Sequence, residues 1–277
     1  MIQSAVNFST SDEKLVAEIA ENIKKYACVW DASSDRDHNR SVITILGNTQ
    51  EEIFSALREC AKAAEKIDLS VHSGAHPRVG SVDVVPIVPL RSETMENCVK
   101  LAHRTGKMFF EEFGIPVFFY EEACLKEENR YLENVRSSHY KTLDIGSVPH
   151  PKQGAVCIGA RCPLIAYNVN LNTDNVKIAK IIAKEIRDMR KAGNPLMYGV
   201  KSMGLYLEKQ KIVQVTCNIT RPHIVGVYEV YSYIEKRAGE LGCGVLESEL
   251  IGAMPYETGQ EIVKNAIKLK NNRNYFI

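Results

Sequence analysis

Apolar side chains recur along the first part of the chain at two different spacings. Alternation of apolar and polar residues over 2–9 predicts a half-buried strand, whereas the apolar positions between 15 and 23 recur at the spacing of a helix. The whole pattern predicts the order β-α-β-β-α-β, with strands over 2–9, 27–32, 40–47 and 82–90 and helices over 15–23 and 49–67.

Helix-capping residues support both predicted helices. Ser9, Thr10 or Ser11 precedes the acidic residues of the first helix, and Thr49 precedes the acidic residues of the second. The polar residues 33–39 are typical of a turn between strands.

The last part of the chain repeats the same order of elements. It predicts strands over 164–171, 198–207, 211–220 and 243–254 and helices over 173–192 and 223–241. A repeated β-α-β-β-α-β unit predicts an α/β (α+β) protein of two similar ferredoxin-like subdomains, over 1–160 and 161–277, with a cleft or tunnel between them.

Extra residues separate the two repeats. They predict a helix over 92–114, a short strand over 115–120 and a second helix over 121–136, followed by a glycine- and proline-rich irregular segment over 141–163. Long irregular segments within compact domains are often functional. Residues 144–161 are therefore a second candidate site.

Composition and charge limit the partners and the cellular location that we expect for this protein. A formal net charge of +1 gives no reason to expect nucleic acid or an anionic membrane surface as a partner. No apolar run is long enough to span a membrane, and the N-terminus lacks the pattern of a signal peptide, so we expect a cytoplasmic protein. The eight cysteines are scattered, which is typical of reduced and mostly buried thiols.

The stretch HSGAHPR, residues 72–78, carries the clearest candidate chemistry. Gly74 permits close approach of a ligand, and Pro77 favours an extended conformation at His76. Arg78 then lies on the same side as His76, where its charge would favour a neutral imidazole that accepts a proton near an anionic substrate. The alternative is a loop histidine that is hydrogen-bonded to the backbone.

Two further interpretations of these polar stretches stay open. His72 and His76 have the spacing of a zinc pair, but Gly74 and Pro77 disfavour a helix and no acidic residue lies between the histidines. The stretch DRDHNR, residues 35–40, is either a solvated turn or a source of a carboxylate, Asp35 or Asp37, that orients a histidine. No P-loop, G-x-G-x-x-G or G-x-S-x-G motif is present.

Cations and amides are concentrated between residues 150 and 170. Glycines and prolines accompany Lys152 and Arg161 in an irregular segment, which could cradle a carboxylate. Asn168 and Asn170 lie on one face of the following strand, where buried amides need hydrogen-bond partners.

Several long strings resemble the glutamate formimidoyltransferases and the formiminotransferase domain of the formiminotransferase-cyclodeaminases. They are VNFS, NRSVITILG, GAHPRVGSVDVVPIVPL, GARCPLIAYNVNL, VKSMGLYLEKQKIVQVTCNIT and VLESELIGAMP, and they occur in the family's order over nearly the whole chain. The resemblance implies two similar α/β subdomains. The chain ends before the helical cyclodeaminase domain of the longer family members.

The resemblance implies transfer of a formimino group from N-formimino-L-glutamate to N5 of tetrahydrofolate, a step of histidine degradation. It places the catalytic histidine at His76 and the folate-binding loop over Gly146–Gly154. Tetrahydrofolate acts as a co-substrate, and neither a metal nor a nucleotide is required. The substrate carboxylates call for cations and polar groups, for which the candidates are Asn39, Arg40, Arg78, Gly146, Lys152, Gly154, Arg161, Asn168 and Lys201.

The chain departs from the family at a few positions. AVNFSTS replaces the common VPNFSEG, the loop over Gly146–Gly154 is one residue shorter than in the animal enzymes, and Ser33 stands where those enzymes carry an aspartate. An acidic partner for His76 must then come from elsewhere in the chain, and the candidates are Asp35 and Asp37. The alternatives to formimino transfer are a formyltransferase that uses N-formylglutamate or 5-formyltetrahydrofolate and a folate-binding homologue without catalysis. We also expect a homodimer, as in the family.

Overall fold

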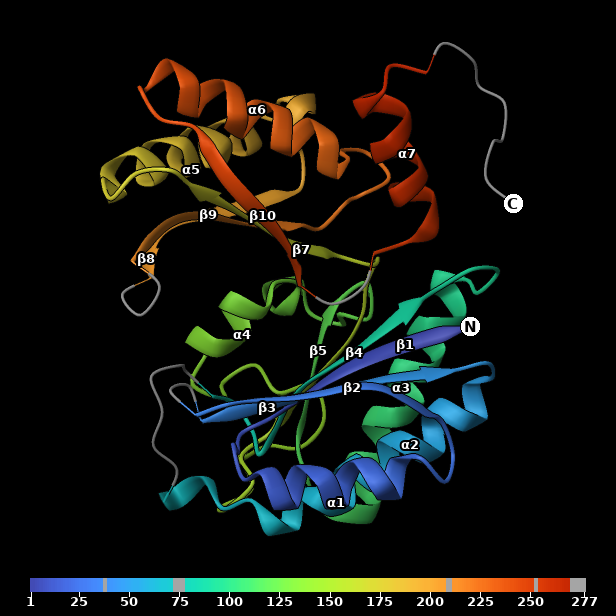
Figure 1. Cartoon of the computed structure of the whole chain (residues 1–277). Helices are drawn as coiled ribbons and strands as arrows, with labels where there is room; N and C mark the ends of the chain where they lie inside the picture. The colour runs from blue at the N-terminus through green and yellow to red at the C-terminus, as the bar shows by residue number, and fades with distance from the viewer. Residues whose placement is uncertain (37–38, 72–77, 208–210, 252–253, 270–277) are drawn as a thin grey trace. The chain divides into compact units, whose positions relative to one another are not determined.

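The computed structural model describes residues 1–36, 39–71, 78–207, 211–251 and 254–269 (Figure 1). The chain divides into two compact units, Met1–Arg161 and Cys162–Ile277. Each unit contains one sheet and its own helices, so the predicted mixed α/β class is confirmed.

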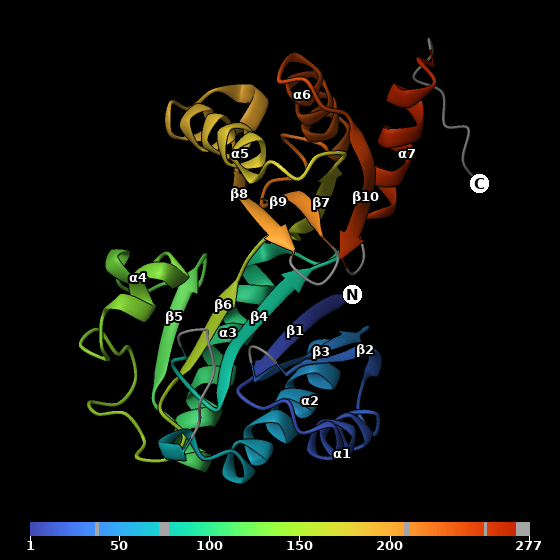
Figure 2. The ribbon, with the colours of Figure 1, turned by 60° about the vertical axis from the view of Figure 1, so that its left-hand side comes forward.

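The first unit is built on a six-stranded sheet. Its strands are β1 (Ile2–Phe8), β2 (Cys28–Asp35), β3 (Arg40–Gly47), β4 (Val82–Pro89), β5 (Val117–Glu121) and β6 (Val156–Ala160). They lie in the order β2-β3-β1-β4-β6-β5. Neighbours among β1–β4 are antiparallel, whereas β6 runs parallel to both β4 and β5. Figure 2 shows β4, β6 and β5 as adjacent strands.

The helices of this unit cover the two faces of the sheet unequally. They are α1 (Glu13–Ile23), α2 (Gln50–Ala63), α3 (Met95–Phe113) and the short α4 (Leu132–Ser137). The main core joins α1, α2 and α3 to one face and includes Val117 and Phe119 of β5. Phe118 and Tyr120 point to the opposite face and form a smaller core with Val135 of α4. Strand β5 is therefore apolar on both faces.

The second unit is a four-stranded antiparallel sheet with helices on one face. Its elements are β7 (Ile165–Leu171), α5 (Val176–Lys191), β8 (Val200–Leu207), β9 (Ile212–Ile219), α6 (Val227–Glu240), β10 (Val245–Ile251) and α7 (Tyr256–Ala266). The strand order is β10-β7-β9-β8. Alternate residues of β9, including Val213 and Val215, enter the core with α5 and α6, while Gln214 and Thr216 lie on the other face.

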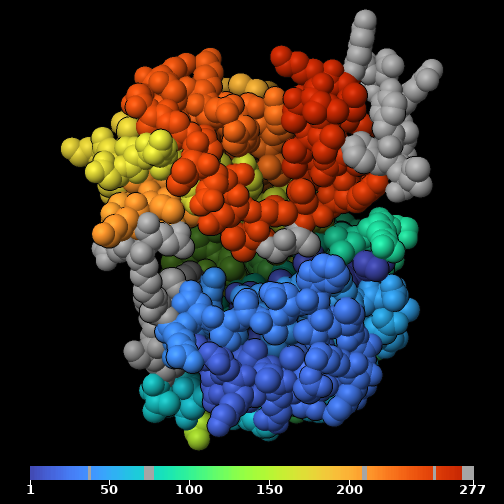
Figure 3. All heavy atoms as spheres, viewed as in Figure 1, coloured from blue at the N-terminus to red at the C-terminus, as the bar shows by residue number. Residues whose placement is uncertain are grey.

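Two predictions near the N-terminus are corrected. Asp12, not Ser9, Thr10 or Ser11, caps α1, because its carboxylate accepts the backbone N–H groups of Lys14 and Leu15 at 2.9 and 3.3 Å. The polar residues 33–35 are not a turn. They continue β2 because β3 supplies a full partner along the strand, with Asp35 opposite Arg40. Most side chains of β2 are exposed at the edge of the sheet (Figure 3).

Two predictions in later parts of the chain are also corrected. Residues 121–136 are not one helix but hold the 3-10 turn Glu127–Asn129 and most of the short α4, because Glu121 ends β5 with a left-handed backbone conformation from which no helix can begin. The segment 141–163 is not irregular throughout, since its residues Val156–Ala160 form the fully buried β6 between two parallel neighbours. Helix α7 was not predicted.

The cysteines of the chain are all free thiols. Cys60, Cys98, Cys157 and Cys217 are buried, Cys124, Cys162 and Cys243 are partly buried, and Cys28 is exposed. Burial raises the pKa of Cys98 to about 12 and that of Cys217 to about 11. No helix among the described residues has the length and hydrophobicity required to cross a membrane.

Candidate active site

Two segments that the sequence singled out separately lie side by side in the first unit. The backbone N–H of Ala155 donates to the Val79 carbonyl oxygen at 3.0 Å, and the N–H of Ser81 donates to the Gln153 carbonyl oxygen at 2.9 Å. Gly80 and Gly154 form an antiparallel bridge between these bonds. The residues that follow HSGAHP are thus held against the end of the loop 146–154.

Glycine is required on both sides of this contact. A Cβ on Gly80 would lie 1.9 Å from the Ala155 carbonyl oxygen, and a Cβ on Gly154 would lie 2.2 Å from the Val79 carbonyl oxygen. Gly154 also has a φ of 67°, which side chains disfavour. Gly80 and Gly154 therefore allow the two backbones to approach to hydrogen-bonding distance.

We predict that Gly80→Ala lowers the free energy of unfolding by about 2–3 kcal/mol, because a backbone atom rather than a flexible side chain blocks the new methyl group. The shift of the urea midpoint measures this effect. Gly239→Ala is the matched control, because Gly239 lies within α6 with nothing near its Cβ position, so alanine should leave stability unchanged or raise it by up to about 1 kcal/mol. Equal midpoints for the two variants would contradict the role of Gly80.

A buried carboxylate anchors the same segment. Asp83 is only 1% exposed, and its Oδ1 accepts the backbone N–H groups of Val79 and Gly80 at 2.7 and 3.3 Å. Its Oδ2 accepts Nη2 of Arg136 at 3.1 Å. The register between β1 and β4 shifts beside Asp83, so the aspartate sits at a bulge that redirects a side chain.

Tyr140 completes the anchoring of Val79. Its hydroxyl donates to the Val79 carbonyl oxygen at 2.8 Å, and its ring lies 6.3 Å from that of Phe118. Asp83, Arg136 and Tyr140 were missed by sequence reasoning. The available signal was the aspartate in the otherwise apolar run VDVVPIVP, since a buried carboxylate needs a cation and hydrogen-bond donors.

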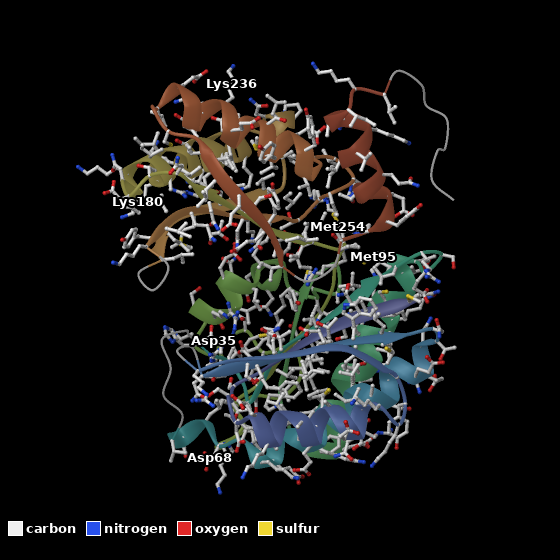
Figure 4. The ribbon with its side chains drawn as sticks, viewed as in Figure 1. Asp35, Asp68, Met95, Lys180, Lys236 and Met254 are labelled. Carbon is white, nitrogen blue, oxygen red and sulfur yellow. The ribbon has the colours of Figure 1, made fainter. Side chains whose placement is uncertain are left out.

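Arg78 lies among several charged groups. Burial lowers the pKa of Arg78. The carboxylates of Asp83 and Asp35 oppose this shift, whereas the guanidinium groups of Arg40 and Arg136 add to it. Asp35 and Arg40 face one another across the end of the β2–β3 pair, and Figure 4 places Asp35 at the end of β2. The structure thus brings the predicted residues Asp35, Arg40 and Arg78 into one charged cluster.

Asn39 has a structural contact beside this cluster. Its φ is 45°, a conformation that asparagine tolerates. Its Oδ1 accepts both the backbone N–H and the hydroxyl of Ser11, each at 3.0 Å. Asn39 therefore ties the start of β3 to the segment before α1.

The predicted folate-binding loop is ordered by His150. The His150 Nδ1 accepts the backbone N–H groups of Lys152 and Gln153 at 3.3 and 3.1 Å, and its backbone pairs with Gly154. Lys152 is exposed, and its Nζ lies 3.9 Å from Oδ2 of Asp68. Gly146, with a φ of 87°, packs instead near Pro116 and Phe110.

Arg161 does not lie at the contact between Gly80 and Gly154. It follows the last residue of β6, whereas Gly154 precedes the first, so the length of the strand separates Arg161 from the Gly154 contact. The Arg161 backbone N–H donates to the Ile87 carbonyl oxygen at 3.1 Å, and its side chain hydrogen-bonds the buried Tyr120.

The asparagines of the second unit belong to a hydrogen-bonded network on the sheet face opposite α5 and α6. Asn170 is fully buried, and its Nδ2 donates to Glu247 at 3.2 Å, while Gln214 donates to the Asn170 Oδ1 at 2.8 Å. Asn168 donates to Glu249 at 3.4 Å. Lys201 of β8 lies on the same face, at the edge of the sheet.

His76, His72 and Asp37 lie outside the described residues. Across the described ranges, no three His, Cys, Asp or Glu side chains gather in a way that would hold a metal ion.

Comparison with known families decides the identity of both units. The model of the N-terminal subdomain of the formiminotransferase domain matches residues 1–161, and that of the formiminotransferase domain matches residues 166–274. The chain belongs to the formiminotransferase family. The two matched ranges together cover nearly all of this formiminotransferase.

Individual relatives of this formiminotransferase match over most of its length. A glutamate formimidoyltransferase of Thermoplasma acidophilum is 36% identical over 285 residues, covering 97% of this chain and 93% of that protein. A glutamate formimidoyltransferase of Streptococcus pyogenes is 37% identical over 237 residues, covering 81% and 78%. A formimidoyltransferase-cyclodeaminase of Dictyostelium discoideum is 32% identical and covers 93% of this chain but 51% of its own length.

Proposed function

We propose that this formiminotransferase is a glutamate formimidoyltransferase that moves the formimino group of N-formimino-L-glutamate to N5 of tetrahydrofolate. The observation that carries the proposal is the similarity to the Thermoplasma acidophilum enzyme over 97% of this chain and 93% of that one. The products are 5-formiminotetrahydrofolate and L-glutamate, and tetrahydrofolate is a co-substrate.

His76 is the proposed proton carrier. N5 attacks the formimino carbon, gains positive charge and passes a proton to the neutral imidazole. The bond between that carbon and the glutamate nitrogen then breaks as the imidazolium returns the proton to the departing amine. Holding both substrates in one site makes the attack a local step. Asp35 and Asp37 are the proposed acidic partners of His76.

The segment that follows His76 supports this role. Val79 and Gly80 are hydrogen-bonded to Asp83, Tyr140 and Ala155, so the chain leaves the histidine stretch along a fixed path. A histidine that must reach both N5 and the leaving amine benefits from such a rigid support.

The remaining predicted residues are proposed to hold the substrates. Cationic side chains suit the glutamate carboxylates of both substrates, and glycines with asparagines suit close approach and hydrogen bonding to folate. The proposed contacts are Asn39, Arg40, Arg78, Gly146, Lys152, Gly154, Arg161, Asn168 and Lys201. The strand orders β2-β3-β1-β4 and β8-β9-β7-β10 support two ferredoxin-like subdomains as their scaffold.

Donor competition tests the identity of the transferred group. With tetrahydrofolate fixed, the purified protein should turn over N-formimino-L-glutamate, and N-formyl-L-glutamate should act only as a weak competitor. Faster turnover of the formyl donor would replace formimino transfer by formyl transfer. Tight binding of tetrahydrofolate by calorimetry without turnover of either donor would indicate a non-catalytic folate-binding protein.

A further inference from the structure

A small cavity of about 70 Å³ lies in the first unit, on the sheet face that α4 covers. Figure 2 shows α4 beside β5 at this face. Phe118 and Val135 form part of its apolar lining, and Arg78, Arg136, His139 and Tyr140 supply polar groups. The cavity is several times larger than the space that one water needs.

Cations outnumber anions among the described residues around Arg78, which lines this cavity. The described residues whose charges act on Arg78 are the cations Arg40 and Arg136 and the anions Asp35 and Asp83. With Arg78 itself, this set holds three guanidinium groups and two carboxylates. Asp83 is already bonded to Arg136 and to two backbone N–H groups, so its charge is largely compensated.

Arg136, which lines the cavity, has one N–H group without a hydrogen-bond partner among the described residues. Its side chain is 22% exposed, its Nη2 bonds Asp83, and its Nε is buried without a hydrogen-bond partner among the described residues. An unsatisfied buried donor is costly, and an anionic acceptor is the partner that a guanidinium N–H binds most strongly.

The backbone at the cavity rim is strained. His139 and Tyr140 are consecutive non-glycine residues with φ values of 50° and 64°. Such conformations are unfavourable and are retained mainly where the surroundings demand them, often at ligand sites. The strain turns the chain so that both residues line the cavity, with His139 exposed and Tyr140 bonded to Val79.

We infer that this cavity is a carboxylate subsite, in which Arg136, His139 and Arg78 bind one carboxylate of a glutamate moiety. The inference rests on the proposed function, because both N-formimino-L-glutamate and tetrahydrofolate carry glutamate carboxylates. The cavity has room for a carboxylate with its neighbouring methylene. Binding at this subsite would position the glutamate moiety next to the support of the histidine segment.

The test compares Arg136→Gln and His139→Asn with the unaltered protein in steady-state kinetics. Asparagine tolerates the left-handed conformation of residue 139, so the second variant should fold even if the first is destabilised. Each variant should raise the KM of one substrate, by about tenfold for Arg136→Gln, with kcat changed by less than about threefold. Arg130→Gln, which removes an exposed guanidinium paired with Glu127, should change neither constant.

The substrate whose KM rises identifies the source of the carboxylate. A rise for N-formimino-L-glutamate assigns the subsite to the donor. A rise in the KM of tetrahydrofolate assigns the subsite to the folate tail. This rise should disappear when tetrahydropteroate, which lacks the glutamate, replaces tetrahydrofolate. Unchanged KM values in both variants, with thermal melting as in the unaltered protein, would overturn the subsite.

Direct binding separates this inference from the proposed function. Calorimetric titration with L-glutamate and with tetrahydrofolate requires no turnover. If the protein fails to transfer a formimino group but one of these ligands binds and Arg136→Gln weakens that binding by about tenfold, the subsite stands while the proposed reaction fails. If neither ligand binds more weakly to the variant, the subsite is wrong even where turnover is observed.

Discussion

Replacing His76 with alanine is expected to lower kcat by about 10²- to 10⁴-fold, the usual contribution of a positioned acid–base group. The KM values should change little, because the imidazole acts on protons that move in the transition state rather than on substrate binding. The melting temperature should stay the same, since the sequence predicts that His76 lies in a loop before the strand that begins at Val82. Steady-state kinetics and a thermal melt of the purified variant provide the measurement.

His72→Ala is the matched control for this experiment. His72 belongs to the same short stretch and carries the same side chain, but the account gives it no chemical role. Its kcat should remain within a few fold of the unaltered protein. A His76→Ala variant with kcat within tenfold of the unaltered protein would remove His76 from the mechanism, and a large loss only in His72→Ala would transfer the role to that residue.

Asp83→Ala is expected to produce the largest loss of stability. It removes a carboxylate that is 1% exposed, leaving Arg136 and the N–H groups of Val79 and Gly80 without their acceptor. Breaking such a buried pair should lower the free energy of unfolding by about 3 kcal/mol. Loss of the support after His76 should also reduce kcat/KM by about 100-fold, in line with the cost of small misplacements.

Urea unfolding and kinetics of the variants measure the two effects of Asp83. Asp83→Asn should fall between the unaltered protein and Asp83→Ala in stability, because the amide oxygen still accepts backbone N–H groups. Asp188→Asn is the control, since Asp188 pairs with Lys184 on the exposed face of α5 and should contribute less than about 1 kcal/mol. Asp83→Ala with the stability and kcat/KM of the control would contradict the anchoring role.

Much of the secondary structure could be predicted because apolar residues recur at a different spacing in strands than in helices. β1 and β3 are buried at alternate residues, and their polar or small residues lie on the opposite face. Thr49 caps α2 as predicted, because its hydroxyl accepts the Glu52 N–H. These signals are local, so the sequence of a single segment contains them.

The errors occurred where distant partners decide the structure. β2 continues through polar residues because β3 pairs with them, and local composition predicts a turn there. β6 forms because β4 and β5 offer parallel edges on both sides. Neither partner can be identified from the segment itself, which explains why polar or glycine-containing strands were missed.

The candidate site was only partly predictable. Gly154 was predicted as the end of the loop 146–154, but its bridge to Gly80 was not, because the two glycines come from segments far apart in the sequence. The pair of Asp83 with Arg136 spans 53 positions and depends on a bulge in β4, so no local pattern indicates it. Arg161 was grouped with the loop cations although β6 separates it from Gly154.

Product analysis of a single reaction tests the central claim most directly. The purified protein is mixed with N-formimino-L-glutamate and tetrahydrofolate, and the products are identified by liquid chromatography and mass spectrometry. The account predicts 5-formiminotetrahydrofolate and L-glutamate in equal amounts, formed repeatedly by each enzyme molecule. Absence of both products, under conditions in which a known glutamate formimidoyltransferase forms them, would contradict the account.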